Sequence, residues 1–162
     1  MSTIPKTMRA AVVRELGAPL NIEEIPVPTP GYGQVLVKVV ASGVCHTDLH
    51  AAHGDWPVKP TLPLIPGHEG VGSVVALGQG VSNLRIGDRV GVPWLHSACG
   101  SCECCITGWE TLCASAAYTG YTVSGGFADY TLAEASHAGR SPEGLDLFEA
   151  APVHCAAMTT YK

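Results

Sequence analysis

Four of the five cysteines within residues 99–113 constrain this chain more than any other feature of its sequence. They follow the spacing C-x2-C-x2-C-x7-C, and four thiolates so close together can enclose one tetrahedral zinc ion. Short spacings keep the entropic cost of closing the loop small. The alternatives are a disulfide-linked loop and an iron–sulfur cluster, although the last gap does not match the common ferredoxin spacings. We therefore expect a structural zinc site with the ligands Cys99, Cys102, Cys105 and Cys113.

Composition and charge narrow the class of protein. A chain of 162 residues suits one domain with a hydrophobic core. The net charge of -5 and the lack of a basic run argue against a nucleic-acid partner. We also expect no membrane span, since no apolar stretch is long enough to cross a bilayer. The segment Met1–Lys6 lacks the apolar region of a secretion signal, and the odd count of seven cysteines suits a reducing compartment, so we expect a cytoplasmic protein.

The hydrophobic pattern predicts a mainly β fold with short helices, either a barrel or a sandwich. Gln34–Ala41 is rich in β-branched residues and predicts a buried strand. The last predicted helix has no glycine cap or proline stop, which suggests a cut chain; a frayed terminal helix is the alternative. We expect further strands at Met8–Arg14, Ile22–Ile25, Gly70–Leu77, Arg89–Val92 and Phe127–Ala133, and helices at Cys45–Ala52, Asp146–Ala151 and Val153–Lys162.

Three other segments contain groups that can bind a metal or transfer a proton. They are Cys45–His50, with a thiol, two imidazoles, a hydroxyl and a carboxylate; Gly67–Gly72, with His68 and Glu69; and the pair His154 and Cys155. Two cysteines and a histidine from separate segments would make a three-ligand zinc site with an open fourth position, the arrangement of catalytic sites. Taken singly, each has a plainer interpretation, because a lone cysteine is usually a small buried hydrophobe and a lone histidine an ordinary core or surface residue.

Together these motifs resemble the catalytic, chaperonin-10-like part of zinc-dependent medium-chain alcohol dehydrogenases. The resemblance covers essentially the whole chain. It implies a partly open β-barrel over residues 1–162 that carries a structural zinc lobe at about residues 95–115. The matching motifs are G-H-E-x2-G-x5-G-x2-V from Gly67 to Val81, G-W-E-T-L-C at the end of the cysteine loop, G-D-R-V from Gly87 to Val90 and G-G-F-A-D-Y from Gly125 to Tyr130.

The resemblance implies a second, catalytic zinc ion and the residues that hold it. Cys45, His68 and Cys155 match the family's catalytic zinc ligands. Glu69 resembles the acidic residue that can approach the metal while ligands exchange. Asp48 is similar to a carboxylate that orients a ligand histidine, a role that fixes the tautomer of the ring.

The resemblance also implies roles in proton transfer and in cofactor binding. Thr47 matches the hydroxyl that takes the proton of the alcohol, and His50 matches the group that carries it to solvent; the plainer interpretation of His50 is a surface histidine. His46 matches a position that contacts the cofactor pyrophosphate, where many members have arginine, so we expect weaker cofactor binding. Thr159 matches a residue near the nicotinamide.

Two tryptophans match positions that line the substrate pocket. Trp56 and Trp94 would narrow an apolar cleft and favour short primary alcohols. The plainer interpretation is that one or both pack in the core, because tryptophan is mostly buried in proteins.

The implied activity is the interconversion of small primary alcohols and aldehydes, in which a zinc-bound alkoxide gives hydride to NAD or NADP. The fingerprint G-x-G-x-x-G is absent from this sequence, and in the family it lies in a Rossmann domain beyond the point where this chain stops. We therefore expect an inactive isolated chain, two zinc ions per chain and a homo-oligomer for the complete enzyme. The alternatives are a non-enzymatic zinc-binding module, a zinc-free reductase of the same superfamily, and a polyol or formaldehyde dehydrogenase.

Overall fold

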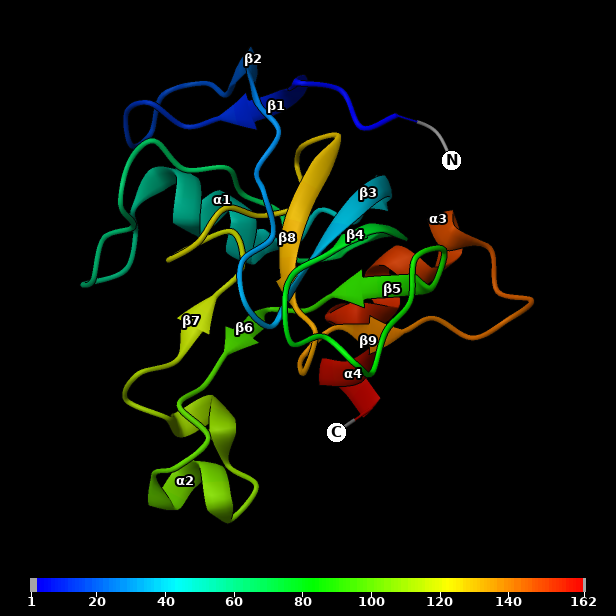
Figure 1. Ribbon diagram of the computed structural model, residues 1–162. Coiled ribbons are helices and arrows are strands. Elements are labelled where there is room, and N and C mark those ends of the chain that lie inside the picture. The colour runs from blue at the N-terminus through cyan, green and yellow to red at the C-terminus, as the bar shows by residue number, and fades with distance from the viewer. Residues whose placement is uncertain (1–2, 162) are drawn as a thin grey trace.

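The computed structural model describes residues 3–161, in which antiparallel sheets surround a small core (Figure 1). The largest sheet has five strands in the order β8-β3-β4-β5-β9. The sheets are open rather than closed into one barrel, and the prediction of a mainly β fold with short helices is confirmed. The strands of the central sheet are β3 (Gln34–Ser42), β4 (Gly70–Leu77), β5 (Arg89–Val92), β8 (Tyr130–Glu134) and β9 (Gly139–Arg140).

Valine side chains form the centre of the molecule. Val35, Val37, Val74 and Val90 are fully buried and pack in one cluster between the strands of the central sheet. Such β-branched residues suit the pleated surface of a strand. In the paired strand β4, Gly72 is required because a Cβ there would lie 1.9 Å from the carbonyl oxygen of Lys38. The two longest strands therefore approach each other more closely than a larger residue would permit.

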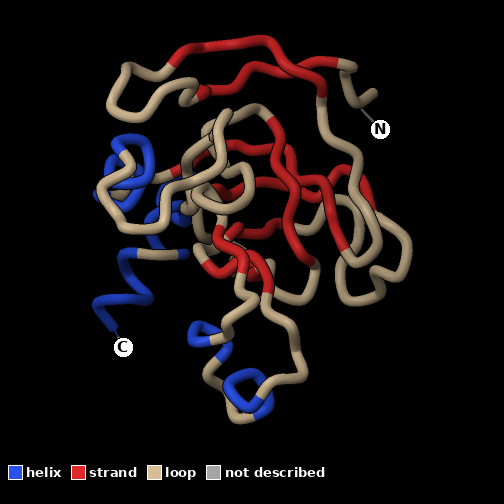
Figure 2. Tube along the Cα trace, turned by 90° about the vertical axis from the view of Figure 1, so that its left-hand side faces the viewer, coloured by secondary structure: helices blue, strands red, loops and turns tan. Residues whose placement is uncertain are grey.

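A separate hairpin of β1 (Thr7–Val12) and β2 (Asn21–Pro26) packs over the central sheet. Alternate residues of β1, including Met8, are buried, as expected for a strand with one face toward the core. Met8 packs with Leu36 of β3 and Tyr130 of β8. This contact attaches the hairpin to the sheet. Figure 2 shows the hairpin as a layer beyond the main group of strands.

The helix α1 (His46–His53) has Cys45 as its N-cap and Gly54 as its C-cap. Its first turn is capped by Asp48, whose Oδ2 accepts a hydrogen bond of 3.0 Å from the Cys45 backbone N–H. Gly54 adopts the left-handed conformation with φ of 68°, which glycine tolerates at a helix end. Ala51 and Ala52 bury the inner face of the helix in the cluster that also contains Val13 and Leu64.

A lobe extends away from the central sheet, and it contains the four-cysteine segment (Figures 1 and 2). Its base is the short ladder of β6 (Leu95–Ser97) and β7 (Ala117–Tyr118). Its tip contains α2 (Glu103–Ile106) and the 3-10 helix η1 (Glu110–Leu112). The sequence did not predict these elements, because each is too short to show a recognisable hydrophobic period.

The C-terminal part of the described chain is α3 (Leu147–Ala150), the 3-10 helix η2 (Ala151–His154) and α4 (Ala156–Tyr161). The prediction of a single helix over Val153–Lys162 is wrong. Cys155 interrupts the helical path with φ of -137° and ψ of -69°. Residue 162 lies outside the described residues. The interruption turns the backbone at the cysteine, which no periodic pattern in the sequence signals.

The other sequence predictions differ mainly at the ends of elements. The bounds of β4 and β5 agree with the predictions. The first strand ends two residues earlier than predicted, at Val12, and β8 begins at Tyr130 rather than at Phe127. The short strand β9 was not predicted. Among residues 3–161, none of the helices is long and apolar enough to cross a bilayer.

Truncation of Leu36 tests the attachment of the hairpin. Leu36 is 1% exposed, so Leu36→Ala should lower the free energy of unfolding by about 2–5 kcal/mol through lost burial and a residual cavity. Urea unfolding at a fixed zinc concentration measures this. The control is Ile22→Ala on β2, where the side chain is 74% exposed and the change should stay within about 0.5 kcal/mol. Equal effects of the two variants would contradict this packing.

Candidate functional site

The fold brings two cysteines and one histidine from distant segments together. Cys45 precedes α1, His68 lies in the loop before β4, and Cys155 lies at the break between η2 and α4. Their ligand atoms all lie within 4.8 Å of one another. The His68 Nε2 atom is 3.3 Å from the Cys155 Sγ atom. The arrangement offers two sulfur ligands and one nitrogen ligand to a single ion, which suits zinc.

Asp48 orients this group from inside the protein. Its side chain is 4% exposed, and its Oδ1 atom lies 2.8 Å from His68 Nδ1. The same oxygen accepts a hydrogen bond of 3.0 Å from the Gly67 backbone N–H. Since Oδ2 caps α1 at Cys45, one carboxylate positions two of the three ligands. With Nδ1 occupied by Asp48, the Nε2 atom of His68 is the nitrogen that faces Cys155 and can bind a metal.

The pKa values of the three groups reflect their shared environment. Burial raises the pKa of Cys45, but the backbone N–H and hydroxyl of Thr47 favour the thiolate and lower it overall. Burial and the nearby Cys45 and Glu69 raise the pKa of Cys155 to about 11. For His68, burial is the largest single effect and opposes the charged form, but the hydrogen bond and the charge of Asp48, together with the Cys45 thiolate, outweigh burial and raise the pKa. A divalent cation would stabilise both thiolates, so metal binding would release protons from this group.

Glu69 lies next to these ligands but is engaged elsewhere. It is 2% exposed, and its Oε1 atom accepts a hydrogen bond of 3.1 Å from the backbone N–H of Ala156. Gly43 leaves room for it, because a Cβ at that position would lie 1.9 Å from Glu69 Oε2. In this conformation Glu69 holds the start of α4 and is outside the group of three ligand atoms.

The predicted proton-transfer and cofactor residues lie along α1. Thr47 and His50 are three residues apart and so lie on one helix face. The His50 side chain is 39% exposed, and its Nδ1 atom is 2.7 Å from Asp55 Oδ2. His46 is exposed, and its ring centroid is 4.7 Å from that of His50. Sequence reasoning missed Asp55, although its place just after the Gly54 helix end was a signal for a residue near the last turn of α1.

Thr159 lies in α4, one turn after Cys155. Its backbone N–H donates a hydrogen bond of 2.9 Å to the Cys155 carbonyl oxygen. Its hydroxyl acts to lower the pKa of Cys155, although burial dominates. The structure therefore places Thr159 beside the cysteine; its predicted proximity to a nicotinamide stays a prediction.

The two tryptophans form an aromatic wall beside His68. The rings of Trp94 and His68 meet edge to face with centroids 5.1 Å apart. The ring centroid of Trp56 lies 6.0 Å from that of Trp94 and 5.8 Å from that of His50. Both indoles also pack, partly buried, against the cluster that includes Tyr121. The two tryptophans thus pack in the core and also lie next to the candidate metal site.

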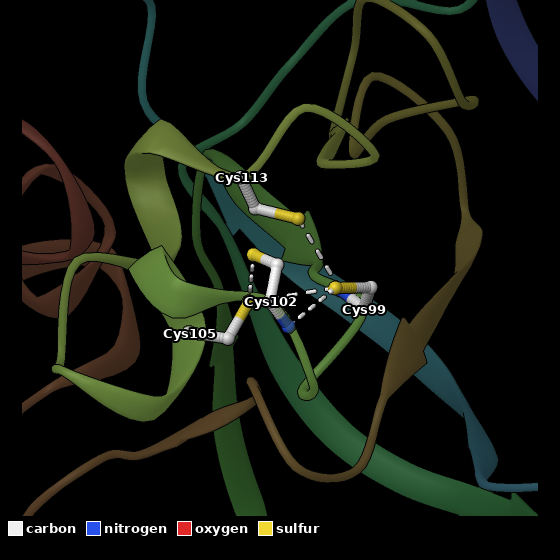
Figure 3. A group of neighbouring side chains, drawn as sticks. All are labelled: Cys99, Cys102, Cys105 and Cys113. Carbon is white, nitrogen blue, oxygen red and sulfur yellow. Dashed lines mark hydrogen bonds between the residues drawn. The ribbon is translucent and has the colours of Figure 1, made fainter.

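The four cysteines of the lobe point toward one another (Figure 3). Their sulfur atoms all lie within 4.8 Å, with Cys105 3.8 Å from Cys99 and 3.5 Å from Cys102. A tetrahedron with zinc–sulfur bonds of about 2.3 Å would place its sulfurs roughly 3.8 Å apart. The ligand set is therefore already near the geometry of a closed zinc site. The cysteines are free thiols, and Cys104 is outside the group.

Backbone amides polarise this four-cysteine group. The N–H groups of Ser101 and Cys102 lower the pKa of Cys99 to about 6. Local desolvation and the hydrogen bond with Cys102 raise the pKa of Cys105 to about 12. One sulfur thus carries negative charge near neutral pH, while a neighbouring sulfur holds its proton. A bound zinc ion would stabilise all four thiolates.

Comparisons with known proteins agree with this architecture. Residues 31–143 match the alcohol dehydrogenase GroES-like domain family. An alcohol dehydrogenase of Rhizobium meliloti (strain 1021) is 65% identical over 156 residues, which are 96% of this chain and 46% of that protein. A thermostable alcohol dehydrogenase from Pyrobaculum aerophilum, solved with cobalt and zinc bound, is 34% identical with a TM-score of 0.86, covering 96% of this chain and 47% of that chain.

A third relative is the acetophenone reductase from Geotrichum candidum, solved in complex with NAD. It is 34% identical with a TM-score of 0.86, covering 99% of this chain and 47% of that chain. This chain therefore belongs to the alcohol dehydrogenase GroES-like domain family, and its resemblance to the catalytic part of zinc-dependent medium-chain alcohol dehydrogenases is confirmed. The chain spans about half the length of the curated relatives that it matches.

Replacement of Asp48 tests the orientation of His68. Asp48→Asn keeps the shape of the side chain but removes the charge that faces Nδ1, so zinc affinity at Cys45, His68 and Cys155 should fall about 10–100-fold. Titration against a chromogenic chelator measures this. Asp55→Asn, which changes an exposed carboxylate near the end of the same helix, should leave zinc affinity unchanged. An Asp48→Asn protein that binds zinc like the wild type would show that the carboxylate is not needed.

Adjacent cysteines of the lobe provide a matched test of the structural site. Cys105→Ser should remove one zinc ion per chain, because a hydroxyl replaces one of four thiolate ligands. Cys104→Ser should retain the full zinc content, since Cys104 lies outside the ligand group. Atomic emission after gel filtration counts the zinc ions. A loss of zinc in Cys104→Ser, or none in Cys105→Ser, would refute the assigned ligand set.

Proposed function

We propose that this chain is the zinc-binding half of an NAD- or NADP-dependent alcohol dehydrogenase that interconverts small primary alcohols and aldehydes. The observation that carries the proposal is the convergence of Cys45, His68 and Cys155 within 4.8 Å. Three protein ligands leave a fourth position for substrate. Zinc bound there would act as a Lewis acid that lowers the pKa of the substrate hydroxyl. The Pyrobaculum relative, solved with cobalt and zinc, supports a metal of this kind.

The residues on α1 are suited to move the substrate proton away from the metal ligands. Thr47 is two residues from Cys45, and its hydroxyl interacts with that sulfur. His50 follows on the same helix face and reaches solvent. When His50 donates its Nδ1–H to Asp55, the Nε2 atom is the ring nitrogen that can accept a proton. We propose that the proton passes from the Thr47 hydroxyl toward His50 and then to water.

The aromatic wall favours small substrates. Trp94 lies against the edge of His68, and Trp56 packs against Trp94. Two large rings on one side of the metal group leave little room for a long or branched alcohol. The same wall is apolar, which suits the hydrocarbon part of ethanol or a similar alcohol.

The hydride acceptor would be a nicotinamide. The Geotrichum relative was solved in complex with NAD, whereas the sequence of this chain contains no G-x-G-x-x-G fingerprint. We propose that the cofactor is held mainly by a Rossmann domain in the part of the relatives that this chain does not span, with exposed His46 at the pyrophosphate and Thr159 near the nicotinamide. We also propose a cytoplasmic location and a homo-oligomeric complete enzyme, and free thiols suit a reducing compartment.

Metal content and activity of the intact protein test the proposal together. We expect two zinc ions per chain and ethanol-dependent reduction of NAD or NADP, with Cys45→Ser abolishing activity and removing one zinc ion. Two zinc ions without oxidation of any alcohol would instead support a non-enzymatic zinc module. Faster turnover of polyols or of formaldehyde adducts would identify a different dehydrogenase, and active protein without zinc would refute the proposed chemistry.

Shortening Trp94 tests the proposed substrate pocket. Trp94→Ala should raise the ratio of kcat/KM for butanol over that for ethanol by about tenfold or more, because added methylene groups gain contacts in the enlarged space. Steady-state kinetics with a series of linear alcohols measures the ratio. The control is Trp109→Ala in the lobe, where the side chain is 56% exposed. An unchanged ratio in Trp94→Ala would show that this ring does not limit the pocket.

A further inference from the structure

Cys155 lies in a segment of the chain that has few buried side chains. It lies at the break between η2 and α4, where the backbone leaves the helical conformation. Within residues 152–161, the side chains are exposed except for those of His154 and Cys155, which are half-buried. Groups that orient a metal ligand commonly raise metal affinity, and the residues on either side of Cys155 make the contacts that hold it.

On the N-terminal side, the ring of His154 fills a slot between two glycines. Gly91 of β5 and Gly139 of β9 are paired directly across the sheet. A Cβ on Gly91 would lie 2.1–2.2 Å from three ring atoms of His154, and a Cβ on Gly139 would lie 3.3–3.4 Å from two of them. The Nε2 atom of the ring is also 3.4 Å from Ser141 Oγ. The edge of the central sheet thus has a space, kept open by glycines, that the imidazole occupies.

On the C-terminal side, the backbone of Ala156 is tied to Glu69. Its N–H donates to Glu69 Oε1 over 3.1 Å, and Glu69 directly follows the ligand His68. Cys155 is thus held between a side chain packed on the sheet and a hydrogen bond from the neighbouring ligand segment. This leaves the Cys155 Sγ atom 3.3 Å from His68 Nε2.

We propose that His154 is a positioning residue for the metal site, and that its ring in the slot of Gly91 and Gly139 fixes the Cys155 sulfur for metal binding. The inference rests on the proposed zinc site and adds a residue to its supporting structure. Without the ring, the segment from Pro152 to Tyr161 loses its contact with Gly91 and Gly139 at the edge of the sheet. The Cys155 sulfur would then sample more positions, and metal binding would cost more conformational entropy because it would have to fix the segment in one conformation.

A double-mutant cycle in the intact protein tests this role. Gly91→Ala should displace the ring, and His154→Ala should remove it, so each should lower affinity for zinc at the Cys45, His68 and Cys155 group about 10–100-fold. The double variant should be no weaker than His154→Ala alone, because the new methyl group then meets empty space. Gly31→Ala is the control, since its Cβ would meet only the flexible end of Gln34 at 3.3 Å.

A shape-preserving variant separates positioning from general stability. His154→Phe keeps a flat ring for the slot and should restore most of the zinc affinity lost in His154→Ala. Gly139→Ala would bring its Cβ less close to the His154 ring than Gly91→Ala does, so it should give a smaller loss of zinc affinity. It replaces Gly91→Ala in the cycle if that variant does not fold. Absorption of the cobalt-loaded protein adds a readout of ligand geometry: the thiolate-to-cobalt bands of this site should weaken in His154→Ala, while urea unfolding of the lobe is unchanged.

The outcomes distinguish this inference from the proposed function. Wild-type protein that binds no metal at Cys45, His68 and Cys155 would contradict the proposed function itself. Wild-type protein with metal in both sites, together with unaltered affinity and cobalt absorption in His154→Ala, would overturn the positioning role alone. Independent, additive losses in Gly91→Ala and His154→Ala would also overturn it, because they would show that the ring and the glycine do not act through one contact.

Discussion

The buried carboxylate of Asp48 is the interaction on which the candidate site depends. It accepts hydrogen bonds from the backbone of Cys45 and Gly67 and lies beside His68 Nδ1. A buried charge is costly unless hydrogen bonds satisfy it, and here the groups that satisfy it belong to two of the three segments that carry the ligands of this site. One side chain therefore caps α1, holds the loop before β4 and orients the His68 ring.

The two candidate metal sites have different structural origins. The lobe collects its four thiols from one short segment, so local turns and the ion itself can organise it. The group of Cys45, His68 and Cys155 joins residues separated by as many as 110 positions in the chain, as the difference between 155 and 45 shows. That group exists only where the central sheet and α1 hold these distant segments together. A closed site suits a structural ion, and a supported site with three ligands suits chemistry.

Secondary structure was predictable where the pattern was long and regular. The valine-rich strands β3 and β4 follow from their β-branched residues, and β5 also agreed with its predicted bounds. The prediction failed at Cys155, where the backbone leaves the helical conformation between the His154 ring, packed on the sheet, and the hydrogen bond from Ala156 to Glu69. It also missed the short strands and helices of the lobe, because a few residues contain too little periodicity to distinguish a strand from a turn.

The sequence alone determined the chemistry available to this protein: the cysteine spacing of the lobe, the ligand types and the family motifs can be read directly from the order of residues. Which of these groups meet depends on how distant segments pack together. The tertiary structure placed Asp55 beside His50, the tryptophans against His68, and the His154 ring between Gly91 and Gly139. These contacts depend on strand register and on the direction of side chains at breaks and helix ends. Those features arise from packing between distant segments and leave no local pattern in the chain.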